Sequence, residues 1–474
     1  MQHNYDMLVI GMGPAGMALS AMGTAMGLKV LAIEKDKIGG ECLNSGCVPS
    51  KALLKTASVR HSIAEVERYG LAKTAVPDPD LPFERIKNYL TYINEEKTLH
   101  MFDKVDLVQG KSARFVDPKT VEAGGKQYSA RRIFIATGTK PMIPPIPGID
   151  TVDYLTNENL FLLDRVPESM FIIGGGPIGC EMGQAFSRLG TRVIIAQSGP
   201  HLVPLADEDT ARILEEELRK EGIEVYTGAS TERIEKKGDL LVITTNVGEF
   251  TVEKLLVAAG RRTTIGELDL DKAGIKYNNR GIIADSQGRT SNPRVWAVGD
   301  CNGKALLSHA AMHQGMLSLM GSVVPFFGRL KFTYDQYQIP WSVFTDPEVA
   351  QVGMTEKQLR EKGIKYEAIK TNYEDYGRAI TDERPAGFVK VLVSPWGKIY
   401  GAAIVGAAAS ELIHEFTLAM HKKIRLYDIM LMQHSFPTIS LMNKRVAEQW
   451  MMRKMRNKGV QKIVRFLYRT FAPK

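Results

Sequence analysis

The chain has 474 residues, of which 44% are hydrophobic and 24% charged, and its net charge is +8. This length predicts three or four domains with ample core, and the composition is that of an ordinary globular enzyme. Four cysteines exclude a disulfide framework, and we expect Cys180 and Cys301 to be buried apolar residues.

The first elements form a strand, a glycine-rich turn, a helix and a second strand. Apolar runs at 5–10 and 30–33 predict the strands, and small residues at 17–27 predict the helix between them. The turn contains Gly11, Gly13 and Gly16, and Glu34 ends the second strand. Such glycines let backbone N–H groups approach a pyrophosphate, and the acid can accept both ribose hydroxyls. The pattern therefore predicts a dinucleotide site.

Two cysteines come directly after this unit. Cys42 and Cys47 lie five positions apart, so a disulfide between them closes a small loop that adds little stability. Thiol–disulfide exchange is the better use for this pair, provided that one sulfur is a thiolate near an electron source.

A second unit of the same kind begins near residue 171. It contains Gly174, Gly176 and Gly179, and its second strand ends at Gln197. The distance from Gly11 to Glu34 and from Gly174 to Gln197 is the same 23 positions. Two such units imply two dinucleotides, with electrons passing from a nicotinamide to a flavin and then to the disulfide.

Later motifs make the resemblance specific. Residues 135–138 (Ile-Ala-Thr-Gly), the segment from Thr290 to Asp300 and residues 344–349 occur in this order along the chain. With the two units and the cysteine pair, they resemble the class I pyridine nucleotide–disulfide oxidoreductases, the group of dihydrolipoamide dehydrogenase and mercuric reductase. The resemblance covers roughly residues 5–442.

The resemblance implies an α/β fold with two Rossmann-like dinucleotide-binding domains and a C-terminal α+β dimerisation domain. The implied FAD domain is 1–148, continued by 270–332, and the NAD(P) domain is 149–269. The dimerisation domain is 333–442, and 443–474 is a basic amphipathic tail.

The resemblance also implies roles for single residues. Cys47 is similar to the sulfur next to the flavin, and Cys42 to the outer thiol that meets the acceptor. Lys51 and Glu181 match a charged pair near the flavin. The residues implied to bind FAD or NAD(P)H are Gly11, Gly13, Gly16, Glu34, Lys51, Thr137, Gly138, Gly174, Gly176, Gly179, Gln197, Gly260 and Asp300. We predict no resident metal.

The coenzyme stays open between NADH and NADPH. Relatives that prefer NAD carry an acid at the position of Gln197, and those that prefer NADP carry arginines nearby. Residues 197–201 offer neither, which gives a slight preference for NADH.

The acceptor segment departs from the family. Dihydrolipoamide dehydrogenases carry a catalytic His and an orienting Glu where this chain has Phe436 and Leu441. A phenyl ring cannot move a proton, so ordinary dihydrolipoamide turnover should fall by roughly 10²–10⁴. His434 lies two residues earlier and is either a substitute base or a structural histidine.

The tail carries most of the positive charge. Residues 443–474 contain ten basic residues and one acid, Glu448, so the rest of the chain is nearly neutral. Apolar residues recur at helical spacing from Val460 to Phe471, with basic residues opposite. The helix is expected either to bind a membrane surface or protein partner, or to pack on the dimerisation domain; nucleic acid binding is the weakest option.

Together these patterns predict a homodimeric reductase that uses FAD with NADH or NADPH and passes electrons through Cys42 to a metal ion, a disulfide or another thiol-reactive acceptor. The alternatives are an electron-entry flavoprotein docked on a membrane and a dihydrolipoamide dehydrogenase-like enzyme that uses His434. No secretory signal or membrane span is evident near the start or at 315–327, so we expect a cytoplasmic enzyme, alternatively held at the inner face of the membrane.

Overall fold

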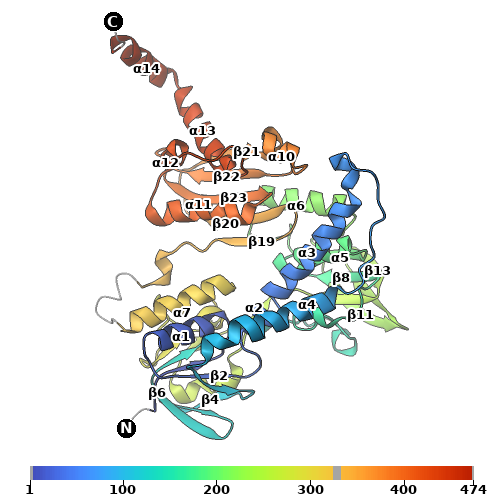
Figure 1. Cartoon of the computed structure of the whole chain (residues 1–474), viewed down its shortest axis with the longest axis vertical. Coiled ribbons are helices and arrows are strands. Elements are labelled where there is room, and N and C mark those ends of the chain that lie inside the picture. Colours follow the sequence, from blue (N-terminus) through green and yellow to red (C-terminus); the bar gives the residue numbers. More distant parts are fainter. Residues whose placement is uncertain (1–3, 324–331, 472–474) are drawn as a thin grey trace. The chain divides into compact units, whose positions relative to one another are not determined.

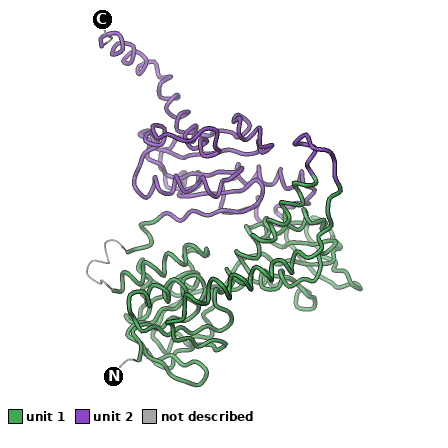
Figure 2. The backbone as a smooth tube through the Cα atoms, in the orientation of Figure 1, with its two compact units in different colours: residues 1–64, 75–196, 229–337 green, residues 65–74, 197–228, 338–474 purple. Residues whose placement is uncertain are grey.

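The computed structural model describes residues 4–323 and 332–471 (Figure 1). Its contacts group the chain into two compact units (Figure 2). Unit 1 contains residues 1–64, 75–196 and 229–337, and unit 2 contains 65–74, 197–228 and 338–474. The predicted domain division, which is based on the family layout rather than on these contacts, stays a prediction.

The main sheet of unit 1 has the strand order β3-β2-β1-β6-β5-β4, and β18 also pairs with β6. The pairs of β1 with β2 and with β6 are parallel, with Met7 opposite Val30 and Arg132. The strands are β1 (Tyr5–Ile10), β2 (Val30–Glu34), β3 (Asp106–Gln109), β4 (Ala113–Asp117), β5 (Thr120–Ala123), β6 (Lys126–Ile135) and β18 (Val295–Ala297).

Both faces of β1 are buried, which is typical of a parallel strand covered on two sides. Met7 and Val9 join one hydrophobic cluster, whereas Leu8 and Ile10 join another. This period of two is what an apolar run such as 5–10 produces when it forms a strand. The helices α1 (Pro14–Ala25) and α7 (Ser308–Val323) pack together on the first of these faces.

A second parallel sheet in unit 1 repeats the arrangement. The strands β8 (Ser169–Ile173), β9 (Arg192–Gln197) and β14 (Lys254–Val257) pair with β8 in the middle, and α5 (Pro177–Arg188) connects β8 to β9. Smaller elements of this unit are α2 (Gly40–Asn44), α3 (Cys47–Ala64), α4 (Pro82–Tyr92), β7 (Thr139–Pro141), β11 (Thr231–Lys237), β12 (Leu240–Thr245), β13 (Gly248–Val252), β15 (Arg261–Thr263), β16 (Tyr277–Asn278) and β17 (Gly281–Ile282).

Unit 2 is built on an antiparallel sheet with the order β19-β20-β23-β22-β21. Its elements are α6 (Glu208–Lys220), β10 (Glu224–Thr227), β19 (Trp341–Val343), β20 (Glu348–Gly353), α9 (Glu356–Glu361), β21 (Glu367–Asn372), α10 (Gly377–Thr381), β22 (Phe388–Val393), β23 (Ile399–Gly406), α11 (Ala409–Lys422), α12 (Leu426–Leu431), α13 (Leu441–Met455) and α14 (Lys458–Thr470). Helices α11, α12 and α13 contribute to the hydrophobic core over this sheet. The combination is an α+β arrangement.

The tail predicted for 443–474 divides into two helices with different surroundings. Helix α13 buries Met442, Val446 and Trp450 in the core of unit 2, whereas α14 has no buried residue. The first part of the predicted tail is thus integral to unit 2, because its apolar residues recur every four positions and meet the sheet. Only the second part extends beyond that core (Figure 2).

Candidate active site

The first glycine-rich turn joins β1 to α1 and leaves its backbone open to a ligand. Gly11 has a φ of +95°, and a Cβ there would lie 2.5 Å from the Ala136 carbonyl oxygen. A Cβ on Gly16 would lie 1.9 Å from the Gly11 carbonyl oxygen. Nothing lies within 4 Å of a Cβ placed on Gly13. The turn therefore needs glycine twice for its own shape and presents Gly13 at the helix N-terminus, where a pyrophosphate binds well.

Glu34 ends β2 with its carboxylate turned back toward this turn. One oxygen accepts from the Met12 N–H at 2.6 Å and the other from the Asp36 N–H at 2.7 Å. Burial raises the pKa of Glu34, and these N–H donors oppose the rise. The acid predicted to accept ribose hydroxyls is thus held in place by the backbone on both sides.

The second turn, from β8 to α5, repeats the sterics of the first. Gly174 has a φ of +109°, and a Cβ there would lie 2.4 Å from the Ala258 carbonyl oxygen. A Cβ on Gly179 would lie 1.9 Å from the Gly174 carbonyl oxygen, and nothing lies within 4 Å of one on Gly176. The same backbone path supports the prediction of a second dinucleotide.

Gln197 ends the second strand of this unit, β9, and is buried. It stands where Glu34 stands in the first unit but carries no charge, so it exerts no charge repulsion on a 2′-phosphate. Gly260 lies just after β14 with a φ of +126°. These two residues leave the choice of coenzyme open.

The two cysteines lie on two consecutive helices. Cys42 is in α2 and is half-buried, whereas Cys47 begins α3 and is exposed. A hydrogen bond from the Cys42 thiol lowers the pKa of Cys47 to about 6, and the Ser308 hydroxyl and the Lys51 charge act in the same direction. That hydrogen bond and burial raise the pKa of Cys42. The pair is therefore poised with a thiolate on Cys47 and a thiol on Cys42.

Ser308 was not predicted from the sequence. It begins α7, and its Oγ lies 3.3 Å from the Cys47 sulfur. The two residues are 261 positions apart, so no local pattern could have linked them. Since Cys47 itself begins α3, the sulfur lies near the starts of two helices, where negative charge is favoured.

Lys51 lies one turn along α3 from Cys47 and pairs with Glu181 of α5. The Lys51 ammonium is 2.7 Å from a Glu181 carboxylate oxygen, and the Glu181 side chain is buried. This contact joins the cysteine-bearing helix to the helix of the second dinucleotide unit. The two residues that the family resemblance paired across 130 positions are thus brought together.

Asp300 is held by a network that the sequence did not reveal. Thr139 donates to Asp300 at 3.1 Å, and the Arg261 Nε donates to the Thr139 hydroxyl at 2.7 Å. The Arg261 guanidinium also pairs with Glu41, the neighbour of Cys42. Burial raises the pKa values of Asp300 and Glu41. The only signal that the sequence offers for Glu41 and Arg261 is that each is adjacent to a predicted site residue.

The polar atoms at this end of unit 1 fit FAD. Within the described part of the chain, the Thr137 hydroxyl and one Glu41 oxygen are buried without a hydrogen-bond partner. Buried polar atoms are normally paired, so these two indicate a polar ligand alongside the open Gly13. Gly138, next to Thr137, has a φ of +67° and open space around it.

The acceptor segment lies between α12 and α13. Phe436 is 80% exposed, and Leu441 packs against the core of unit 2. The His434 side chain is only 4% exposed, and its Nε2 lies 3.2 Å from a Glu415 oxygen. Glu415 also accepts from the Asn443 amide at 2.8 Å. His434 is thus held inside unit 2 by hydrogen bonds, a setting that favours a structural role, and its role as a base stays a prediction.

One group of acidic side chains in the described part of the chain has metal-like spacing, namely Asp207, Asp209 and Glu356. The Lys390 ammonium lies 2.9, 2.6 and 2.9 Å from these three carboxylates and is almost fully buried. Their charges hold the pKa of Lys390 above its usual value despite the opposing effect of burial. The group is therefore an ion-pair cluster inside unit 2.

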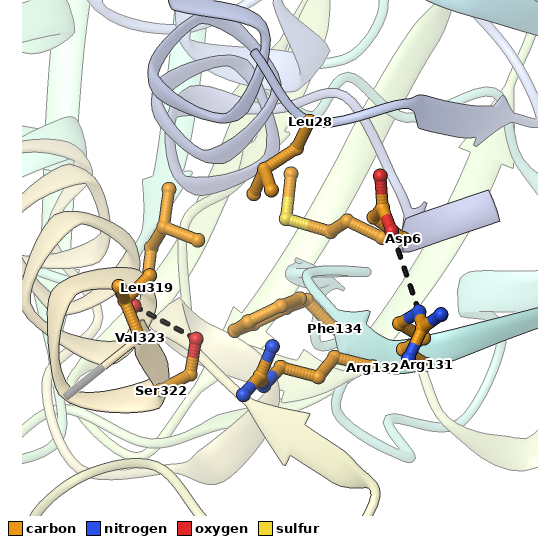
Figure 3. Close-up of a pocket in the computed structure, with 9 residues that line it drawn as sticks. Asp6, Leu28, Arg131, Arg132, Phe134, Leu319, Ser322 and Val323 are labelled. Carbon is orange, nitrogen blue, oxygen red and sulfur yellow. Dashed lines mark hydrogen bonds and ion pairs between the residues drawn. The ribbon is translucent and has the colours of Figure 1, made fainter. Parts of the chain in front are cut away.

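A cavity of about 150 Å³ in unit 1 lies apart from all of these residues (Figure 3). Asp6 and Arg131 form an ion pair at its edge with a distance of 3.5 Å. None of the predicted site residues lines this cavity.

Comparison with known proteins identifies the family. The model of the pyridine nucleotide-disulphide oxidoreductases matches residues 5–315, and the model of their dimerisation domain matches 339–446. The chain belongs to the pyridine nucleotide-disulphide oxidoreductase family. The fold class predicted from the sequence is confirmed, and so are the enzyme class and the use of FAD with NADH or NADPH.

Individual relatives fall on both sides of the acceptor question. A dihydrolipoyl dehydrogenase of Thermus scotoductus is 35% identical over 92% of this chain and 95% of its own length. A mercuric reductase of Bacillus cereus is 33% identical over 90% of this chain and 68% of its own. A solved Cu(II) complex of the HOCl-induced flavoprotein disulfide reductase RclA from Escherichia coli superposes with a TM-score of 0.85 at 25% identity, covering 95% and 100% of the two chains.

The dimerisation-domain match supports the predicted homodimer. No helix among the described residues is long and apolar enough to cross a membrane.

Proposed function

We propose that this enzyme takes a hydride from NADH or NADPH and delivers two electrons, through the Cys42–Cys47 disulfide, to an acceptor that reacts with thiols. The observation that carries the proposal is the cysteine pair itself, with its thiolate on Cys47 and its thiol on Cys42. FAD, when bound, supplies the conversion between hydride transfer and thiol chemistry. Gly11, Gly13, Gly16, Glu34, Thr137, Gly138 and Asp300 would hold it.

The step at the cysteines is balanced in electrons and protons. Two electrons and one proton break the Cys42–Cys47 bond, leaving Cys42 as a thiol and Cys47 as a thiolate. Ser308 and Lys51 stabilise the negative sulfur. Cys42 then attacks the acceptor after losing its proton, and the disulfide re-forms as the acceptor is reduced.

Lys51 and Glu181 position this chemistry. Their 2.7 Å contact holds a positive charge one helical turn from the Cys47 sulfur and fixes α3 against α5. Glu181 is buried beside the second glycine-rich turn, where the nicotinamide coenzyme would bind through Gly174, Gly176 and Gly179. The pair thus links the side where electrons enter to the side where they leave.

The acceptor segment supports a substrate that needs no protein base. Phe436 and Leu441 cannot transfer protons, and His434 faces Glu415 within unit 2. A metal ion or a disulfide with a good leaving group has no such requirement. Among the relatives, one is named a mercuric reductase, and RclA was solved as a Cu(II) complex, which favours a metal ion as substrate here.

The test is the replacement Cys42→Ser in the purified flavoenzyme. It should abolish NAD(P)H-dependent reduction of Cu(II), Hg(II) and small disulfides, while electron transfer from NAD(P)H to an artificial dye persists. Cys180→Ser is the matched control, because Cys180 is fully buried and should leave both reactions intact. Full metal and disulfide reduction by Cys42→Ser would contradict the proposal.

The second candidate is an electron-entry flavoprotein that is docked on a membrane and reduces a quinone directly. The exposed basic helix α14 is the observation that favours it. This enzyme would keep its quinone activity after Cys42→Ser, so the same variant separates the two. A third candidate, dihydrolipoamide oxidation with His434 as base, predicts turnover that His434→Ala abolishes.

We also propose a cytoplasmic homodimer with the four-part division predicted from the sequence. The dimerisation-domain match and the separate core of unit 2 support this arrangement.

A further inference from the structure

The helix α14 exposes one continuous apolar stripe. Val460, Ile463, Val464, Leu467 and Phe471 recur every three or four positions and so lie on one side of the helix. The described residues of the chain do not cover this stripe, since α14 has no buried residue. Two aromatic side chains, Phe466 at 65% and Tyr468 at 81% exposure, flank it. A soluble helix that packs on its own protein buries such a stripe.

The opposite side of α14 is entirely cationic. Lys458, Lys462, Arg465 and Arg469 also recur every three or four positions, about 180° around the helix from the stripe. No acid comes after Glu448 in the sequence, so no ion pair within α14 neutralises these charges. A helix laced for solubility alone mixes both signs, whereas this one carries a single sign.

The helix is firmly joined to the body of unit 2. Helix α13, which precedes it, buries Met442, Val446 and Trp450 in the core. Asn457 separates the two helices and caps α14, accepting from the N–H groups of Gly459 and Val460 at 2.9 and 3.3 Å. The sequence thus starts α14 with a defined cap at the end of an anchored helix, and Figure 2 shows it extending past the sheet of unit 2.

We propose that α14 lies in the headgroup region of an anionic phospholipid membrane and holds the reductase at that surface. At 13 residues the helix is about 20 Å long, too short to cross a bilayer but long enough to lie along it. Its apolar stripe would enter the acyl boundary, its aromatics would lie at headgroup depth, and its cations would meet lipid phosphates. This inference goes beyond the proposed reaction and is independent of the acceptor.

A second copy of α14 is the competing occupant. Two such helices would bury their stripes together, but 13 residues give fewer than two heptads, and Phe466 and Tyr468 occupy the flanks where pairing helices carry complementary charges. Charge complementarity therefore favours the anionic lipid surface, because every charge on the helix has the same sign.

The experiment is flotation of the full-length holoenzyme with phosphatidylcholine vesicles and with mixed phosphatidylcholine–phosphatidylglycerol vesicles. The proposal predicts binding to the mixed vesicles, loss of that binding at high salt, and about tenfold or more weaker binding to phosphatidylcholine alone. Equal binding to both vesicles, or to neither, would overturn it.

Paired variants separate the two faces of the helix. Lys462→Glu with Arg465→Glu should weaken binding to the mixed vesicles by more than tenfold, as should Ile463→Ser with Leu467→Ser. The charge control is Lys236→Glu with Lys237→Glu on exposed β11, and the apolar control is Leu162→Ser with Leu205→Ser, both expected to bind like the unaltered enzyme. Dye reduction and far-ultraviolet circular dichroism confirm that each variant is folded. If the two apolar α14 substitutions instead halve the mass of a tetramer without changing flotation, the occupant is a second copy and the proposal is wrong.

Discussion

The two glycine-rich turns of unit 1 share the same backbone path but end on different residues. In each, the first glycine has a positive φ and the last touches the first glycine's carbonyl oxygen. The first unit then ends on Glu34, held by two backbone N–H groups, and the second on uncharged Gln197. Turn shape is therefore fixed by sterics common to both, whereas ligand choice depends on one side chain at the end of the second strand.

The units also differ in the chain segment that comes after this strand. The first unit continues into the two cysteines, and the second into Ser198 and Gly199, with no thiol. One dinucleotide site thus has an outlet attached to it and the other does not, as expected if electrons enter at the second site and leave at the first.

The largest effect should come from blocking each turn separately. Gly11→Ala should lose bound FAD, because the new Cβ would lie 2.5 Å from a carbonyl oxygen; Gly174→Ala should retain FAD but lose reduction by NAD(P)H, for the matching 2.4 Å contact. Flavin content and anaerobic flavin reduction measure the two losses.

Gly27→Ala is the control for this pair. Gly27 also has a positive φ, at +78°, but nothing lies within 4 Å of a Cβ there, so only backbone strain is added. Loss of FAD from Gly174→Ala at an unchanged unfolding temperature would break the assignment of the two sites.

A smaller effect is expected when the second unit is made to resemble the first. Gln197→Glu places a carboxylate beside the coenzyme ribose, where it accepts hydroxyls and repels a 2′-phosphate. The ratio of kcat/KM for NADH to that for NADPH should rise by at least about tenfold, ~1.4 kcal/mol. Gln197→Leu should lower both values without a comparable change in their ratio. An unchanged ratio in Gln197→Glu would show that coenzyme choice lies elsewhere.

The smallest effect concerns Ser308. Because the Cys47 pKa is lowered to about 6, the reduced enzyme should show its thiolate absorbance fully at neutral pH and lose it as pH falls through 6. Ser308→Ala removes one stabilising hydroxyl, so the loss should begin at a pH higher by about one unit. A pH titration of thiolate absorbance measures this, with Ser62→Ala on the exposed side of α3 as the control. An unchanged midpoint would mean that the 3.3 Å contact does not stabilise the thiolate.

The sequence predicts local features well because their causes are local. The glycines, Glu34 and the cysteine pair each depend on chain geometry within about thirty residues, and the structure places them at the turns and helix starts expected. Ser308, Arg261 and Glu41 could not be predicted in this way, since their contacts join segments brought together only by the sheet. The buried state of α13 was likewise missed, because the abundance of basic residues from 444 to 456 obscures the apolar residues spaced four apart.

The central claim is that electrons reach the cysteine pair before they leave the enzyme. Anaerobic titration of the purified flavoenzyme with NADH, and separately with NADPH, tests it most directly. We predict that two electrons free two thiols and produce the long-wavelength absorption of a thiolate beside oxidised flavin, and that Cys47→Ser abolishes this band. Bleaching of the flavin by the first two electrons, with the Cys42–Cys47 disulfide still intact, would contradict the claim.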